Sequence, residues 1–130
     1  MPRPSTNFAI PTKTSRGLHA LIIEDEFMIA LAIEHVLRDC GFETFDIALS
    51  GEAAIEAAAE QRPDLITADV QLRPGCGIEA VRVICPQPST PVIFITGNAR
   101  EVRQRMPQHT VLDKPFSEQT LTYTVAASLS

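Results

Sequence analysis

The sequence predicts an α/β fold in which five parallel strands alternate with five helices. Three observations predict it. Short apolar runs recur along the chain, segments with helical spacing of apolar residues separate them, and Gly, Pro and Ser residues mark many of the junctions. Such alternation is typical of a parallel sheet with helices on both faces. With 130 residues, of which 45% are hydrophobic and 21% charged, the chain can form one domain with its own core.

The predicted strands are short runs rich in apolar and β-branched residues. The run VIFIT (92–96) is the most apolar, whereas FETFDIA (42–48) is amphipathic and is expected at a sheet edge. The run DLITAD (64–69) reads as a buried strand that ends in a carboxylate, Asp69. The expected strands are 18–25, 42–48, 64–69, 92–96 and 109–113.

The predicted helices have recognisable ends. Gly41 follows the first helix, where a left-handed residue is common, and Ser50 is a good N-cap for the second. Pro63 closes the second helix, Pro107 ends the fourth, and Ser117 caps the last. The expected helices are 27–40, 51–61, 78–85, 99–106 and 118–128.

The last helix has the weakest signal. Leu121, Tyr123 and Val125 also fit the alternation of a strand, but the strand–helix order of the preceding chain favours a helix. Right-handed crossovers leave few topologies for such a chain. The expected fold is a flavodoxin-like, doubly wound five-stranded parallel sheet with strand order 2-1-3-4-5 and five helices.

Composition narrows the class of partner. The net charge of −5 argues against nucleic acid as a ligand, and no apolar segment is long enough to span a membrane. The three cysteines lack metal-like spacing and suggest free thiols in a reducing cytoplasm. Residues 1–17 read as a flexible N-terminal tail that can dock through Phe8 and Ile10, and residues 18–130 as the folded domain.

Chemically useful side chains occur where the predicted strands end. The first strand ends in Glu24 and Asp25, the third in Asp69, the fourth in Thr96, and the fifth runs into Lys114. Because ligands bind at the carboxyl ends of parallel strands, we expect these groups to share one edge of the sheet. Each residue alone has an ordinary structural explanation, such as a turn residue or a solvated lysine. Their coincidence at one edge favours a site.

Three carboxylates in one site repel one another and need a counter-charge. Mg²⁺ with oxygen ligands supplies it, Lys114 adds a positive charge, and Thr96 can donate a hydrogen bond. Gly97 allows the backbone to approach a phosphoryl oxygen closely. The set predicts phosphoryl transfer in which Asp69 is the nucleophile and forms an aspartyl phosphate.

These motifs resemble the receiver domain of bacterial two-component response regulators. The resemblance rests on ED at Glu24 and Asp25, on Asp69 after LITA, on Thr96 after VIFI, and on KPF from Lys114. It implies a sensor histidine kinase or histidine phosphotransferase as the phosphoryl donor, Mg²⁺ as the cofactor, and commonly a cis bond before Pro115. It further implies that the metal is held by Asp25, Asp69 and the Gln71 carbonyl, with Glu24 acting through water. The phosphoryl oxygens would be held by Thr96, the Gly97 amide and Lys114.

Two features depart from the usual receiver pattern. Val111 occupies the place of an aromatic switch residue, three positions before the lysine, so the usual coupling of threonine and ring cannot operate. Position 71 is a glutamine, whereas phosphatases with a similar acyl-phosphate cycle carry an aspartate there as general acid. We therefore expect slow hydrolysis of the aspartyl phosphate and a lasting phosphorylated state. The stretch FITGN resembles stand-alone receivers with an F-x-T-G motif, and ADVQLRPGCGIEAV is similar to receivers of the general stress response.

The leading interpretation is a single-domain response regulator, with at most slow autodephosphorylation rather than enzymatic turnover. It would signal through a protein contact on the fourth helix, fifth strand and fifth helix, or act as a phosphate sink. Arg100, Arg103 and Arg105 make the fourth helix basic, as either a solvated face or a docking surface for an acidic partner. Two alternatives stay open: a Mg²⁺-dependent phosphatase on the same edge, and a receiver-like binding module that is not phosphorylated.

Overall fold

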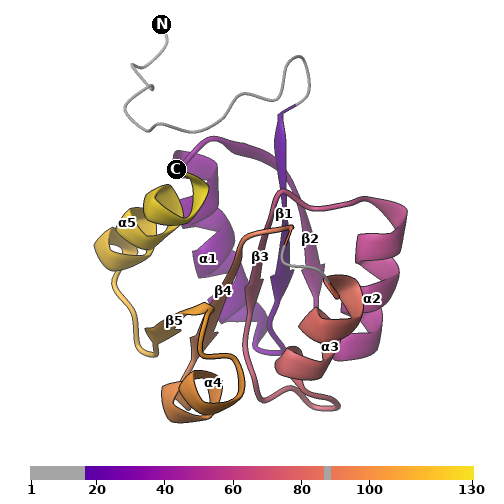
Figure 1. Ribbon diagram of the computed structural model, residues 1–130. Helices are drawn as coiled ribbons and strands as arrows, with labels where there is room; N and C mark the ends of the chain where they lie inside the picture. The colour runs from indigo at the N-terminus through magenta and orange to yellow at the C-terminus, as the bar shows by residue number, and fades with distance from the viewer. Residues whose placement is uncertain (1–16, 87–88) are drawn as a thin grey trace, which may run out of the picture.

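The computed structural model describes residues 17–86 and 89–130 and shows a three-layer α/β sandwich (Figure 1). The expected docking residues Phe8 and Ile10 lie outside the described part of the chain. Five parallel strands lie in the order β2-β1-β3-β4-β5, as predicted. The strands are β1 (Leu18–Ile23), β2 (Phe42–Ala48), β3 (Leu65–Ala68), β4 (Val92–Thr96) and β5 (Thr110–Asp113).

The five predicted helices form, with ends within one residue of expectation. Gly41 has φ 106° after the first helix, and the Ser50 and Ser117 hydroxyls accept hydrogen bonds from Ala53 N and Thr120 N. The ambiguous last segment is helical because both its cap and its buried positions, Leu121 and Val125, suit a helix. The helices are α1 (Phe27–Asp39), α2 (Gly51–Glu60), α3 (Gly77–Ile84), α4 (Ala99–Arg105) and α5 (Glu118–Leu129).

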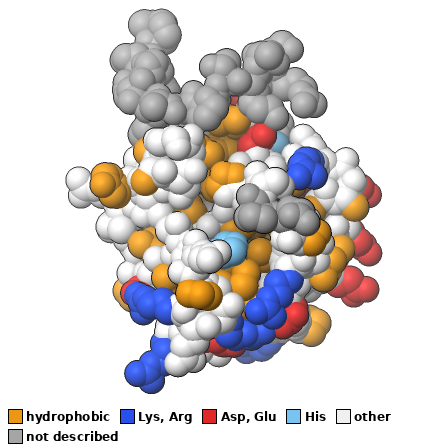
Figure 2. Space-filling model, in the orientation of Figure 1, with side chains coloured by type: hydrophobic (Ala, Val, Ile, Leu, Met, Phe, Trp, Pro, Cys, Tyr) orange, Lys and Arg blue, Asp and Glu red, His pale blue; other side chains and the backbone are white. Residues whose placement is uncertain are grey.

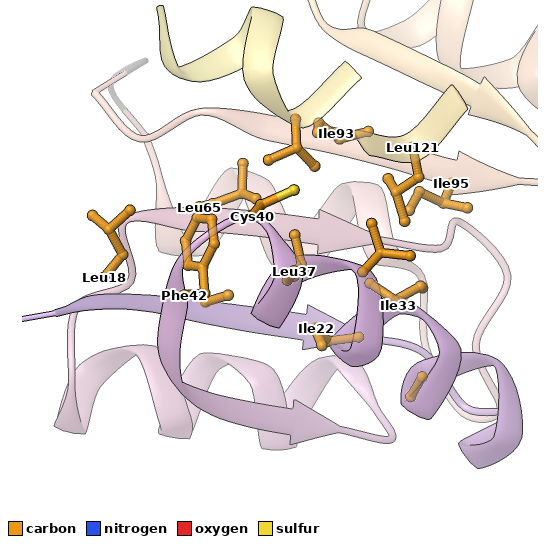
Figure 3. Packing of buried hydrophobic residues seen from close by; sticks show 14 residues of the cluster. Leu18, Ile22, Ile33, Leu37, Cys40, Phe42, Leu65, Ile93, Ile95 and Leu121 are labelled. Atoms are coloured by element: carbon orange, nitrogen blue, oxygen red, sulfur yellow. The ribbon is translucent and has the colours of Figure 1, made fainter. Parts of the chain in front are cut away.

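The helices cover both faces of the sheet, with α1 and α5 on one side and α2, α3 and α4 on the other (Figure 1). Strand β1 shows how the sheet serves both layers, since successive side chains point to opposite faces. Ala20 and Ile22 join the cluster under α1 and α5, whereas Leu21 and Ile23 join the other. Figure 3 shows side chains of α1 and α5 directed toward β1 and β4 in the first cluster.

His19 has a structural role at the amino end of the sheet. Its ring is buried, with Nδ1 2.8 Å from Thr44 Oγ1 and Nε2 3.0 Å from Asp46 Oδ2, both on β2. Its backbone N–H donates to Asp64 Oδ2 at 2.8 Å, just before β3. His19 therefore ties β1 to β2 and to the segment before β3. The sequence gives no sign of these contacts, because they join three segments that are far apart along the chain.

Gly77 shapes the end of the sheet where the strands finish. Its N–H donates to Val70 O at 2.8 Å, and a Cβ added here would collide with the carbonyl oxygen of Asp69. Glycine therefore allows α3 to begin directly against the backbone that carries Asp69. At Gly97, in the turn after β4, an added Cβ would meet open space.

We predict that Gly77→Ala destabilises the fold by about 2 kcal/mol, because the new methyl group would overpack against backbone that has little room to move. Gly97→Ala is the matched control and should change the free energy of unfolding by no more than about 0.5 kcal/mol. Urea denaturation followed by circular dichroism measures both values. Equal effects of the two substitutions would contradict the packing argument.

Candidate functional site

Three carboxylates converge at the carboxyl end of the sheet. Glu24 and Asp25 follow β1, and Asp69 follows the neighbouring strand β3. One oxygen from each lies within 4.8 Å of the others, and Glu24 and Asp69 are buried. Parallel pairing of β1 with β3 places the two strand ends side by side, so the sequence-predicted acidic residues are brought together. Burial at this separation makes their mutual repulsion strong.

Lys114 partly compensates this charge. Its Nζ lies 2.9 Å from Asp69 Oδ2 as a hydrogen bond and 2.8 Å from Glu24 Oε1 as an ion pair. The Lys114 N–H donates to Thr96 O at 3.0 Å, which fixes the loop after β5 beside the end of β4. The Lys114–Pro115 bond is cis, as the resemblance implied. One ammonium group thus faces three carboxylates and leaves the cluster with an excess of negative charge when all are ionised.

The electrostatics follow from burial and these contacts. Burial raises the pKa of Glu24, although the Lys114 ammonium and the Glu26 N–H, 3.1 Å from Oε2, oppose this rise. Burial lowers the pKa of Lys114, but its contacts with Glu24 and Asp69 outweigh burial and the pKa is raised overall. Lys114 therefore stays charged at neutral pH and provides a permanent counter-ion.

The donor set fits a hard divalent cation. It offers carboxylate oxygens only, and the buried Glu24 Oε1 has the Lys114 ammonium, 2.8 Å away, as its ion-pair partner. Mg²⁺ prefers such oxygen ligands and retains several waters. The exposed Arg73 guanidinium lies 3.7 Å from Asp25 Oδ2. Gln71 lies in an isolated bridge with Cys76, so a role for its carbonyl in metal binding stays a prediction.

The turn after β4 forms the other wall of the site. Thr96 is buried at the end of the strand, and the Asn98 N–H donates to its Oγ1 at 3.0 Å. The hydroxyl hydrogen of Thr96 is left to donate elsewhere. Gly97 is exposed, with open space around its α-carbon. Val111, in the expected place of an aromatic residue, is half-buried against the α2–α4 side of the core.

Among the described residues, the other two histidines and the three cysteines contribute no ligand atom to the carboxylate cluster. His35 is exposed near Asp39, and His109 packs edge-on against Phe94. The three cysteines, Cys40, Cys76 and Cys85, are free thiols. Burial raises the pKa of Cys40 and of Cys85, which keeps these thiols protonated at neutral pH.

Sequence reasoning missed several contacts around the site. Arg73 beside Asp25 lies in a loop, where spacing carries no information. Arg103 lies 3.8 Å from Asp113, and Arg105 bonds Glu101 and Glu79, so two of the three α4 arginines have acidic partners within the chain. Only the i,i+4 spacing of Glu101 and Arg105 was a usable signal.

Comparison with known proteins identifies the class. The sequence pattern described as "Response regulator receiver domain" matches residues 20–126. The chain is 33% identical over 113 residues to the phyllosphere-induced regulator PhyR of Methylorubrum extorquens, covering 84% of this chain and 42% of that protein. It is 30% identical over 120 residues to the transcriptional regulatory protein PdtaR of Mycobacterium tuberculosis, covering 89% and 56%.

Solved structures agree on the fold. The receiver domain of the Erythrobacter litoralis PhyR response regulator superposes with a TM-score of 0.80 at 33% identity, covering 90% of this chain and 93% of that one. The Vibrio cholerae chemotaxis protein CheY4 superposes with a TM-score of 0.76 at 26% identity, covering 88% and 100%. The chain therefore belongs to the response regulator receiver domain family.

The match has clear limits. The chain spans 24% of a protein-glutamate methylesterase from Archaeoglobus fulgidus, at 29% identity, and less than two thirds of the other curated relatives named above. Activities of those whole proteins do not transfer with the receiver. Across the described ranges, 17–86 and 89–130, no helix has both the length and the apolar character to cross a bilayer.

We predict that Lys114→Met destabilises the protein by about 2 kcal/mol, because it leaves buried carboxylates without their ammonium partner. Adding Glu24→Gln should recover part of the loss by removing one of the repelling charges. Mg²⁺ should raise the urea midpoint of Lys114→Met more than that of the wild type, since binding to the native state alone stabilises it. Arg38→Met, which breaks an exposed pair in α1, is the control. No Mg²⁺ effect in any variant would contradict the proposed metal fit.

Proposed function

We propose that the protein is a phosphorylated receiver in which Asp69 accepts a phosphoryl group from a histidine kinase or histidine phosphotransferase. The observation that supports this most directly is the contact of Lys114 with Asp69 inside a carboxylate cluster that borders the Thr96 turn. The proposed receiver unit spans residues 18–130, preceded by a flexible tail at 1–17, and works in the cytoplasm.

Each residue of the site has a proposed part. A phosphorus–oxygen bond forms with the Asp69 carboxylate as the phosphorus–nitrogen bond of the donor breaks. The histidine ring keeps the bonding pair and leaves as neutral imidazole when its other nitrogen carries a proton. Lys114, the Thr96 hydroxyl and the Gly97 N–H hold the phosphoryl oxygens. Bound Mg²⁺, held by Asp25, Asp69 and the Gln71 carbonyl and through water by Glu24, would supply further neutralisation of charge.

Hydrolysis of the product is expected to be slow. Gln71, two residues after Asp69, carries an amide that neither accepts nor donates a proton as a general acid or base near neutral pH. With slow hydrolysis the protein acts as a lasting signal, or as a phosphate sink that takes up one phosphoryl group per molecule, rather than as an enzyme, and this separates it from the phosphatase alternative. Decay of the phosphorylated mass over time measures this property.

We assign the two kinds of partner, the phosphoryl donor and the downstream protein, to two exposed surfaces. Phe27, Met28 and Leu31 are 51%, 76% and 38% exposed in the first turns of α1, which begins two residues after the acidic pair, and we call them the apolar rim. We assign this rim to the donor. Output is assigned to the surface of α4, β5 and α5, where Tyr123 is 76% exposed. Similarity to PhyR, described as a stress response regulator, supports a role in stress signalling.

We predict that incubation with acetyl phosphate and Mg²⁺ adds the mass of one phosphoryl group, and that Asp69→Asn abolishes the addition because an amide is not a nucleophile here. Asp113→Asn is the matched control, since this aspartate also ends a strand but its side chain is 65% exposed and paired with Arg103. Intact mass spectrometry measures the product. Equal labelling of Asp69→Asn and wild type would refute the acceptor assignment, whereas no labelling of the wild type would favour an unphosphorylated binding module.

We predict that Met28→Asp slows transfer from a phosphohistidine donor by about tenfold while leaving labelling by acetyl phosphate unchanged. The small donor needs no docking surface, whereas a protein donor loses apolar contact and meets a new charge. Tyr123→Asp is the control for adding a charge to an exposed apolar residue on a different helix, α5. The donor assignment fails if Tyr123→Asp slows transfer and Met28→Asp does not.

A further inference from the structure

A chain of polar contacts links the turn after β4 to α3. Asn98 Nδ2 donates to Glu101 Oε1 at 3.1 Å, and Arg105 Nη1 donates to Glu101 Oε2 at 2.9 Å. Arg105 Nη2 donates to Glu79 Oε2, on α3, at 2.6 Å. We call Asn98, Glu101, Arg105 and Glu79 the α3–α4 bridge. Figure 2 shows basic side chains gathered over α4 and α3, with acidic ones among them.

Both ends of the bridge return to the functional site. At one end, the Asn98 N–H donates to Thr96 Oγ1 at 3.0 Å. At the other, Glu79 is in the first turn of α3, which begins at Gly77 against the backbone of Asp69 and Val70. The bridge therefore closes a ring that joins the acceptor segment to the phosphoryl-binding turn. A movement of either segment stretches contacts of the other.

The geometry of Arg105 suits it to this position. Its two terminal nitrogens engage two carboxylates from two different helices, and its side chain is only 33% exposed. A lysine would offer a point charge instead of this planar fork. By contrast, Arg82 lies 3.5 Å from the same Glu79 within α3 and links nothing to the turn.

α4 has few other constraints. It has seven residues, of which Ala99 and Val102 are buried, and no side-chain cap hydrogen bond at Asn98. Val111 on the adjacent strand β5 is aliphatic and half-buried, so it offers no hydrogen bond and no ring. The polar contacts of the bridge thus restrain the turn that follows Thr96, in addition to the bond of the Asn98 N–H to Thr96 Oγ1 and that of the Glu101 N–H to Asn98 O.

We propose that Arg105 is a positioning residue: through Glu101 and Asn98 it holds the Thr96–Asn98 turn in place, and through Glu79 it couples that turn to α3. The coupling to phosphorylation rests on the proposed function, whereas the positioning in the free protein does not. Two measurements separate the two parts.

The first measurement needs no phosphorylation. Amide hydrogen exchange by NMR should be about threefold or more faster at Asn98 in Arg105→Ala and in Glu79→Ala, because the turn loses its tether. The double variant should match the single ones, since both break the same chain of contacts. Glu101→Gln, which keeps an acceptor for Asn98, should be affected less than Glu101→Ala. Arg38→Ala, which breaks the same i,i+4 type of pair in α1, is the control and should leave Asn98 unchanged.

The second measurement uses acetyl phosphate and Mg²⁺. Labelling of Arg105→Ala should be about two- to fivefold slower than wild type, and phosphorylation should alter exchange at α3 amides less than it does in the wild type. Exchange at Asn98 that is the same in Arg105→Ala, Arg38→Ala and wild type overturns the positioning role. A change in α3 exchange on phosphorylation that is as large in Arg105→Ala as in the wild type overturns the coupling. A wild type that takes no label refutes the proposed function, and the first measurement still decides the positioning role.

Discussion

The contact of the Lys114 ammonium with Glu24 and Asp69 is the interaction on which the rest of the site depends. The fold gathers three carboxylates at one edge, where burial raises the pKa of Glu24 and the Lys114 ammonium opposes that rise. The Lys114 ammonium lies 2.9 Å from Asp69 Oδ2 as its counter-charge, and the backbone N–H of Lys114 donates to Thr96 O at the end of β4. A single residue thereby links charge compensation to the geometry of the turn that faces the acceptor.

Much of this arrangement was predictable because it follows from local signals and parallel topology. Ser50, Gly41 and Ser117 mark helix ends by their own backbone and side-chain chemistry, and the structure shows each in that role. Once the strands were parallel and ordered 2-1-3-4-5, Glu24 and Asp69 had to lie side by side. The topology therefore carried more information about the site than any one motif did.

The unpredicted parts share a physical cause, since they are contacts between side chains whose segments meet only in the folded chain. The bond of Arg105 to Glu79 joins residues 26 positions apart, and His19 bonds Thr44 25 positions away. Neither has a periodic pattern, because surface and edge contacts depend on rotamers and helix orientation. The close approach of Gly77 to Asp69 was equally invisible, although a glycine at the start of a helix is a hint that backbone lies near.

The two sides of the site are held in place by different kinds of contact. Asp69 follows a strand that is buried along its whole length, and α3 starts against it through Gly77, so the acceptor side is fixed by backbone packing. The opposite wall depends on a seven-residue helix, an edge strand and polar contacts that are partly exposed. Contacts of that kind are individually weak and reversible. Under the proposed function, a change at Asp69 is therefore most easily accommodated on the α4 side, which is part of the surface that we assign to output.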